Sequence, residues 1–407
     1  MKMKERRLRA LTSWLLGLLG LALGLLALAS VTASLFAAPA LRRDDDFGIL
    51  WGSAYLHRSG ENPYSPLALN RILQAIGHAP VAEDAVALMW YAPYVFAGLF
   101  PFTLLPYPNA RALWFWFSMI SLAASFTWIW KSYVGALSRP WIAWGLGFFF
   151  FPTMMMLLKG QIGWLILLGL VGLAAALERR SPLGVGLALL PLLLKPHLVY
   201  LVLLILLFWT WRSHLWLSLA IFALGLGAAT AFAWLLNPRI LADYLDALRH
   251  YAPLGWATPT TGFLLRILLH SDQAILSFLP VIPGAIWATL RWLTRRECWS
   301  WIEELPRLIL ISILTAPYGW SFDWVLLIWP LLQISAKLVQ AHTKLLIVFI
   351  LAYALIDLLG LLTYIFVYPH ALGDFAQIWM PWIVFLGYLL LAPHATPGHP
   401  NARGNLP

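Results

Sequence analysis

The chain has 407 residues, of which 61% are hydrophobic and only 11% are charged, and its net charge is +10. About a quarter of the residues in soluble proteins are charged, so this composition and the mean hydropathy of +0.79 exclude a soluble enzyme. Lys and Arg cluster at the ends of apolar segments, where they set membrane orientation, so we expect no nucleic-acid partner.

Apolar runs long enough to cross a bilayer recur along the chain, which predicts an all-α polytopic membrane protein with about 11 to 13 transmembrane helices, some of them broken. The first run, residues 11–38, outlasts the core of a signal peptide, so we expect an uncleaved span and a cytoplasmic N-terminus; cleavage near "SLFAAPA" is the alternative. The expected spans are residues 11–36, 88–105, 111–130, 141–158, 162–178, 183–211, 214–236, 262–293, 305–318, 320–336, 345–367 and 377–392.

The longest polar stretch, residues 42–87, is expected to form the first outer loop. It opens with Asp44, Asp45 and Asp46, and apolar residues then recur at helical spacing on both sides of the Pro-rich turn "SGENPYSP". This pattern predicts two amphipathic helices in the outer membrane interface, with the acids at the positive end of the first helix. A helix N-cap needs only one aspartate, so we interpret the three as candidate catalytic carboxylates; a simple cap is the alternative.

Two later segments are expected to break inside the membrane, because Pro152 interrupts residues 141–158 and "LLKPHL" interrupts residues 183–211. Lys159, Gln161, Lys195 and His197 would then approach the outer face. Charges at membrane depth usually face a cavity or a partner, so the cations are candidate contacts of an anionic substrate.

Each of these residues also has a structural interpretation. Lys159 is typical of an interfacial anchor, and His197 of a hydrogen bond to a neighbouring helix. Arg266, in "TTGFLLRILLH", is a further candidate contact of an anionic substrate, with a snorkelling side chain as the alternative. The basic segment "RWLTRRECW", Lys337 and Lys344 indicate cytoplasmic loops.

The remaining polar positions favour structural roles. The spacing in "NPRILADYLDALRHYAPLGW" predicts another interfacial helix, whose Asp243, Asp246 and His250 form a solvated face, with acceptor binding as the alternative. Asp357 lies inside an apolar span, and its partner cannot be named from sequence. We expect one integral-membrane domain over residues 1–392 and a disordered Pro- and Gly-rich tail over residues 393–407.

The run "DFGILWGSAYLHRSGENPY" resembles the GT-C superfamily of membrane glycosyltransferases, and within it glycosyltransferase family 87. Further similar segments follow in the expected order: "YAPYVFAGLFPFTLLP", "KGQIGWLILLGL", "LGVGLALLPLLLKPHLVYLVLLILLFWTWR", "TPTTGFLLRIL" and "APYGWSFDWVLLIWPLL". The likeness extends over most of the chain. One segment departs from the family pattern, since relatives tend to show a His near the position of Asp323.

The resemblance implies transfer of a sugar from a polyprenyl-phosphate donor to an acceptor at the outer face, generally with inversion at the sugar carbon. It implies that the acid of the first outer loop is the general base; by position this is Asp46, while Asp44 and Asp45 fit less well. Asn62 and Tyr64 of the "G-x-N-P-Y" turn then become candidate substrate contacts, together with Lys159, Gln161, Lys195, His197 and Arg266. In relatives the sugar is mannose or arabinose, and the acceptor is a glycan, a glycolipid or a protein.

This reaction requires few functional groups. A carboxylate takes the proton of the attacking hydroxyl, and cations stabilise the departing phosphate, so we expect no cofactor. A divalent metal at the aspartates is the alternative, although adjacent aspartates point in different directions. Cys298, the single cysteine, excludes a cysteine-based metal cluster.

Two other classes of function compete with glycosyl transfer. A transporter or lipid flippase would also have broken helices and a few buried charges, but it commonly carries internal repeats, which this chain lacks. A scaffold subunit of an envelope complex is the other alternative. Since no sequence signal indicates an organelle, we expect a multi-pass protein of the bacterial inner membrane, with its active site on the periplasmic side.

Overall fold

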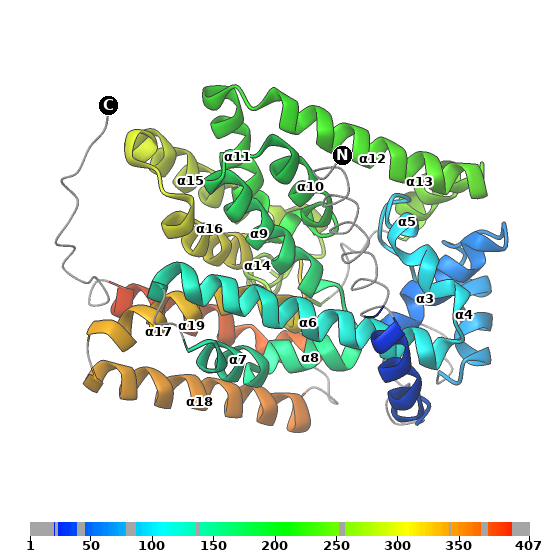
Figure 1. Ribbon diagram of the computed structural model, residues 1–407, viewed down its shortest axis with the longest axis horizontal. Helices are drawn as coiled ribbons and strands as arrows, with labels where there is room; N and C mark the ends of the chain where they lie inside the picture. The colour runs from blue at the N-terminus through cyan, green and yellow to red at the C-terminus, as the bar shows by residue number, and fades with distance from the viewer. Residues whose placement is uncertain are drawn as a thin grey trace, which may run out of the picture. The chain divides into compact units, whose positions relative to one another are not determined.

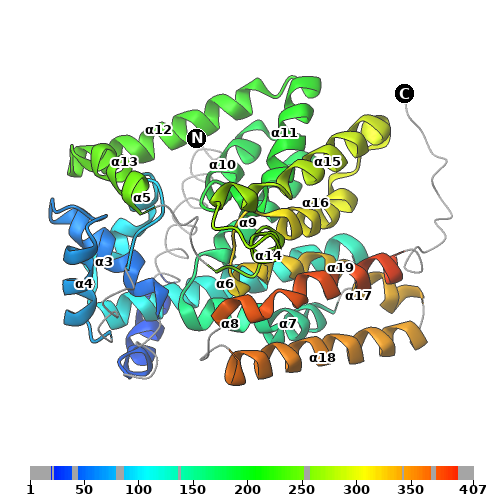
Figure 2. The ribbon, with the colours of Figure 1, turned by 180° about the vertical axis from the view of Figure 1, so that it is seen from behind.

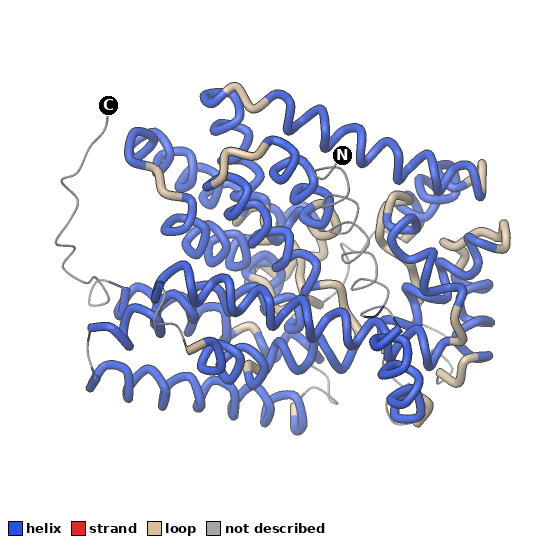
Figure 3. Tube along the Cα trace, viewed as in Figure 1, coloured by secondary structure: helices blue, strands red, loops and turns tan. Residues whose placement is uncertain are grey.

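A computed structural model describes residues 20, 23–38, 45–78, 87–135, 139–251, 257–341, 343–367 and 373–392. Within these residues every regular element is a helix and none is a strand (Figure 3). The predicted all-α polytopic membrane fold is therefore confirmed. Asp44, residues 11–19, 21 and 22 of the first predicted span, and the predicted disordered tail lie outside the described residues.

Six helical segments of the described chain are long and apolar enough to cross a membrane, and a bent pair makes a seventh. The six are Tyr107–Val134, Trp216–Leu236, Ala274–Cys298, Ser321–Ala341, Lys344–Phe366 and Gly373–Leu391. Five shorter apolar helices accompany them: Leu23–Phe36, Val95–Leu104, Gly163–Glu178, Pro182–Leu192 and Tyr200–Ser213. Several of the predicted spans are thus short or broken helices within the described residues.

The chain forms two compact units, which we describe separately. Unit 1 comprises residues 1–120, 157–161 and 227–250, and unit 2 the remaining residues. The helices α6 (Tyr107–Val134), α8 (Phe151–Lys159) and α12 (Trp216–Leu236) belong partly to each.

Unit 1 is built around α3 (Asp46–Arg58), which contacts α4 (Pro66–Ala75), α5 (Val95–Leu99) and the 3₁₀ helix η1 (Phe100–Leu104). Figure 1 shows α3 and α4 side by side, as the two helices predicted for the first outer loop. Most residues of α3 are buried, from Phe47 to His57, so it packs inside the unit, whereas α4 buries only Leu69 and Leu73. The helix α13 (Ile240–His250), predicted from its apolar spacing, completes the unit.

Unit 2 packs around α16 (Trp301–Thr315), which contacts helices before and after it in the chain (Figures 1 and 2). Its helices besides α6, α8, α12 and α16 are α7 (Pro140–Phe149), α9 (Gly163–Glu178), α10 (Pro182–Leu192), η3 (Pro196–Leu198), α11 (Tyr200–Ser213), α14 (Thr261–Leu268), η5 (Ala274–Phe278), α15 (Val281–Arg295), η6 (Arg296–Cys298), η7 (Ser321–Leu327), α17 (Ile328–Ala341), α18 (Thr343–Phe366), η8 (Gly373–Gln377) and α19 (Trp379–Leu391).

Both predicted helix breaks are confirmed. The helices α7 and α8 are bent by 68° at Phe150, so that Pro152 lies in the first turn of the second helix, where its missing N–H costs nothing. The segment "LLKPHL" separates α10 from α11, with η3 between them.

The prediction of one continuous span over residues 262–293 was wrong. The helix α14 ends at Leu268, and His270 adopts a left-handed backbone conformation with φ of 47°. The chain then folds back, so that α14 packs on η5, and a Cβ atom at Gly262 would meet the carbonyl oxygen of Ser277 at 2.3 Å. The polar segment "HSDQ" at residues 270–273 marks this break. The prediction for residues 88–105 was also too long, because helix begins only at Val95.

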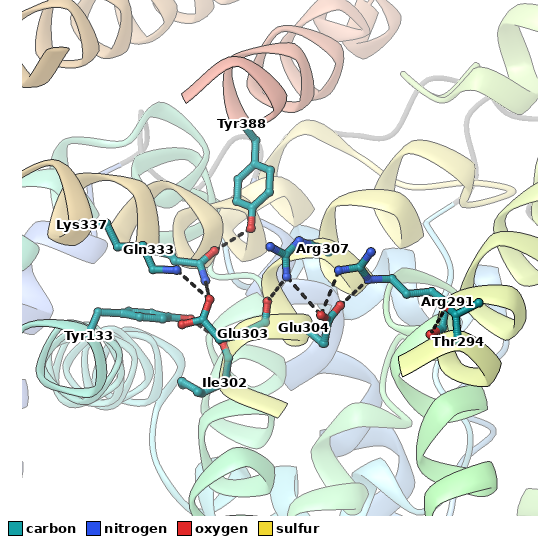
Figure 4. Close-up of polar contacts among 10 residues, drawn as sticks. All are labelled: Tyr133, Arg291, Thr294, Ile302, Glu303, Glu304, Arg307, Gln333, Lys337 and Tyr388. Atoms are coloured by element: carbon teal, nitrogen blue, oxygen red, sulfur yellow. Dashed lines mark hydrogen bonds and ion pairs between the residues drawn. The ribbon is translucent and has the colours of Figure 1, made fainter. Parts of the chain in front are cut away.

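A network of charged and polar side chains ties one region of unit 2 together (Figure 4). Glu304 accepts hydrogen bonds from Arg291 and, at 3.2 Å, from Arg307. The neighbouring Glu303 accepts from Lys337 at 2.6 Å and from Gln333 at 3.0 Å. The helices α15, α16 and α17 are therefore joined through two adjacent carboxylates.

We expect Glu304→Gln to destabilise the protein by about 3 kcal/mol, because it leaves two arginines without their counter-ion in a largely buried place. The Glu304 side chain is only 6% exposed. Glu297→Gln is the matched control: Glu297 pairs with Arg212 at the surface, where both side chains are exposed and solvent screens the pair, so its loss should leave the stability almost unchanged. Denaturation of both variants in mixed detergent micelles checks this; equal losses would contradict it.

Candidate functional site

Asp45 is the N-cap of α3, and its carboxylate is fully engaged. Its oxygens accept hydrogen bonds from the Phe47 N–H at 3.1 Å, from the Tyr107 hydroxyl at 2.5 Å and from Nε of Arg111 at 2.9 and 3.1 Å. Burial raises the pKa of Asp45 to about 6, while Arg111 and the other donors act in the opposite direction. The carboxylate is thus charged at neutral pH but surrounded by hydrogen-bond donors, which favours a structural role for Asp45, while its place among the catalytic residues stays a prediction.

Arg111 extends this ion pair to a third helix. Its Nη2 donates to the carbonyl oxygens of Leu157 and Leu158, both at 2.8 Å, near the C-terminal end of α8. A cation at this end of a helix satisfies carbonyls that lack a partner within the helix and matches the helix dipole. We call Asp45, Tyr107 and Arg111 the clasp, because they hold the start of α3 against the end of α8.

Asp46, the next residue, lies in the first turn of α3 and is only half-buried. Its Oδ2 accepts a hydrogen bond from Nε2 of Gln161 at 2.8 Å. Sequence analysis placed both residues near the outer face without predicting that they touch. The carboxylate of Asp46, unlike that of Asp45, keeps one oxygen without a hydrogen bond among the described residues.

The turn that carries Gln161 is tightly specified. Gly160 has a left-handed backbone with φ of 66°, and a Cβ atom there would lie 2.6 Å from Cβ of Phe47 and 3.0 Å from Cζ of Arg111. Only glycine allows this close approach. Lys159, a predicted phosphate contact, ends α8 just before the turn and is half-buried.

The "G-x-N-P-Y" turn has a structural role in unit 1. The side-chain oxygen of Asn62 accepts from the backbone N–H of Tyr64 at 2.8 Å, which forms an Asx turn. Tyr64 is buried, its hydroxyl donates to the carbonyl of Tyr91 at 2.9 Å, and its ring packs against Tyr244 of α13. These contacts fix the loop on its neighbours, and they account for Asn62 and Tyr64 without a substrate.

His57 is a buried histidine of α3 that sequence analysis missed. It is 1% exposed and stacks on Phe96, and neither ring nitrogen has a hydrogen-bond partner among the described residues. Burial lowers the pKa of His57 from 6.5 to about 4. The imidazole is therefore neutral in the folded protein at neutral pH.

We expect unit 1 to lose stability in mild acid for this reason. Because the folded-state pKa of His57 lies below the unfolded one, the contribution of His57 to stability is complete above pH 6.5 and is lost as the pH drops toward 4, by about 2 kcal/mol between pH 7 and pH 5. The raised pKa of Asp45 acts with the opposite sign and offsets part of this loss. His57→Phe, which keeps the stacked ring, should flatten this dependence, while the exposed His250→Phe should not. Tm measured against pH checks both; an unchanged slope in His57→Phe would contradict the assignment.

In unit 2, Lys195 forms a buried ion pair with Asp323. Their Nζ and Oδ1 atoms are 2.5 Å apart, and the side chains are 6% and 0% exposed. The other carboxylate oxygen accepts from the Trp320 N–H at 3.1 Å, and the rings of Trp320 and Phe322 face the ammonium. Asp323 is thus the counter-ion of Lys195, and the pair accounts for the burial of both charges.

The other two predicted phosphate contacts in unit 2, His197 and Arg266, have surroundings unlike those of Lys195. His197 stacks on Tyr318 with ring centres 3.9 Å apart, and the predicted hydrogen bond to a neighbouring helix is not formed among the described residues. Arg266 is buried, packs over Phe263 and donates to the carbonyl oxygen of Asp272 at 3.4 Å, so it does not snorkel. Asp46 belongs to unit 1 and Lys195 to unit 2.

Asp357 has a partner that sequence could not name. Its Oδ1 accepts the backbone N–H of Phe151, the first residue of α8, at 2.8 Å. One turn earlier on α18, the Tyr353 hydroxyl donates to the carbonyl of Leu146 in α7. Both sides of the bend between α7 and α8 are therefore satisfied from α18, and Asp357 has a structural role.

Arg111 and Tyr107 were the residues that sequence analysis overlooked at the clasp. The available signal was an arginine in the first turns of a 28-residue apolar helix, where a charge calls for a partner. The described residues contain no group of three or more His, Cys, Asp or Glu side chains placed to hold a metal ion. On α13, Asp246 pairs with His250 at the exposed face, as expected for a solvated surface.

Comparisons of the chain with protein-family models, with curated proteins and with solved structures find no match.

Proposed function

We propose that the protein is an inverting glycosyltransferase that moves a sugar from a polyprenyl-phosphate donor to a hydroxyl of an envelope acceptor at the outer face of the bacterial inner membrane. The observation that carries the proposal is the pair of neighbouring aspartates. Asp45 is used up in the clasp, whereas Asp46 projects a half-exposed carboxylate from the start of α3, held by one hydrogen bond from Gln161. A general base needs this combination of a fixed position and an open oxygen.

In the proposed reaction, the acceptor hydroxyl attacks the anomeric carbon of the sugar as Asp46 takes its proton. The bond from that carbon to the phosphate oxygen breaks, and the polyprenyl phosphate leaves with the electron pair. Since the leaving group is already a stabilised anion, it needs a cation more than a proton. Lys159 is the predicted phosphate contact that lies in the same unit as Asp46, two residues from Gln161. We assign the phosphate to Lys159 ahead of Lys195, because Lys159 lies in the same unit as the proposed base.

Transfer by purified protein from synthetic donors tests the proposal. Radiolabelled polyprenyl-phosphate mannose and polyprenyl-phosphate arabinose would each be given with octyl mannoside or a bacterial membrane lipid extract as acceptor. We expect label in an acceptor with at least one lipid donor and none with nucleotide-linked mannose. Absence of transfer from both lipid donors to both acceptors would reject the proposal. Movement of the lipid donor between leaflets of proteoliposomes without transfer would favour the flippase alternative.

A further inference from the structure

We infer that Gln161 is the positioning residue of the proposed base: it fixes which oxygen of Asp46 faces the acceptor hydroxyl. The inference rests on the proposed function. Nε2 of Gln161 donates to Oδ2 of Asp46 at 2.8 Å, so rotation of the carboxylate about its Cβ–Cγ bond is opposed. The acceptor proton then goes to the other oxygen, Oδ1.

The helix α8, which precedes Gln161 in the chain, has a side-chain partner at each of its ends. At the N-terminal end of this helix, Asp357 accepts the N–H of Phe151. At its C-terminal end, Arg111 binds the carbonyls of Leu157 and Leu158. The nine-residue helix thus has a negative group at its positive end and a positive group at its negative end, an arrangement that stabilises both termini.

Gly160 connects this helix end to Gln161 in a tight turn and so restricts the position of the Gln161 side chain. Its left-handed turn brings the backbone against Phe47 and Arg111, one residue before Gln161. The same arginine binds Asp45, the residue before Asp46. The acceptor carboxylate is therefore one residue away from a group that binds Arg111, and the donor amide directly follows a glycine whose backbone lies against the same arginine, which leaves little freedom in their separation.

A glutamine suits this role better than a charged donor. An amide N–H holds the carboxylate without competing for the transferred proton, because the amide does not titrate. A lysine at this place would neutralise the carboxylate and weaken it as a base. Reactions that depend on such alignment lose about a hundredfold in rate for a misplacement of about 1 Å.

The inference is tested by kcat, donor KM and pH dependence of transfer in Gln161→Ala and Gln161→Glu. We expect Gln161→Ala to lower kcat by about tenfold to a hundredfold, with donor KM changed by less than about twofold. In Gln161→Glu, the introduced carboxyl can donate to Asp46 only when it is protonated, so the ratio of variant to wild-type kcat should be higher at pH 5 than at pH 8. A purely structural role would not produce this pH-dependent recovery.

Gln340→Ala is the matched control, because Gln340 is an exposed glutamine that donates to the carbonyl of Tyr133 away from the candidate site. It should leave kcat unchanged. If the wild type transfers sugar and Gln161→Ala keeps the wild-type kcat, the inference is overturned while the proposed function stands. A pH-independent ratio in Gln161→Glu also overturns it. A wild type that transfers nothing from any lipid donor overturns the proposed function, and the inference with it.

Discussion

Asp45→Asn is expected to destabilise the protein by about 3–5 kcal/mol, while Asp46→Asn changes its stability by less than about 0.5 kcal/mol. The asparagine keeps the size of the side chain and much of its capping ability, so the loss at position 45 reports the charge. Arg111 is 1% exposed, and without Asp45 it becomes a buried cation without a counter-ion. The half-exposed carboxylate of Asp46 is not the counter-ion of a buried arginine. It accepts one hydrogen bond from a neutral amide.

The measurement is unfolding of the two variants by mixed detergent titration, together with Tm. Arg111→Leu is the companion variant: it should be at least as damaging as Asp45→Asn, because it also removes the donors to Leu157 and Leu158. Similar losses of stability at positions 45 and 46 would contradict the assignment of a structural role to Asp45 and a non-structural role to Asp46.

The second large effect is expected at the ion pair of Lys195 and Asp323. Lys195→Met and Asp323→Leu should each cost about 3–5 kcal/mol, because each leaves an uncompensated charge in a buried place. The double variant Lys195→Met/Asp323→Leu should recover most of this loss, since well-packed apolar residues often replace a buried ion pair at little cost.

A double-mutant cycle in stability, followed by donor KM of the double variant, separates a structural lysine from a substrate contact. If the pair is structural, the double variant is stable and binds the donor with about the wild-type KM. A stable double variant whose donor KM rises more than about tenfold would return Lys195 to the phosphate site, as the sequence analysis had placed it.

The broad fold was predictable because hydropathy and proline are local signals. The helices α3, α4 and α13 followed from apolar spacing, and the breaks near Pro152 and Lys195 followed from polar or proline residues inside apolar runs. The fold-back of α14 onto η5 was missed, because the apolar composition of residues 262–293 is the same whether the chain runs straight or returns. Only "HSDQ" signalled the difference.

The sequence predicted several residues of the candidate site, but it did not predict which of them form pairs. The aspartate run, Lys159 and Gln161 were singled out from sequence, but nothing local indicates that Arg111 pairs with Asp45, 66 residues away, and not with Asp46. The partners of Asp357 and Lys195, 206 and 128 residues distant, are likewise set by helix packing. Tyr64, which was chosen through a family motif, has a structural contact that the motif did not predict.

The most direct test of the central claim is single-turnover transfer by Asp46→Asn with the donor bound. This substitution removes the proton acceptor while keeping the side-chain shape, so the rate should fall by about 10²- to 10⁴-fold with the donor Kd unchanged. A wild-type single-turnover rate in Asp46→Asn would contradict the account, because the reaction would then proceed without the carboxylate that the account makes its base.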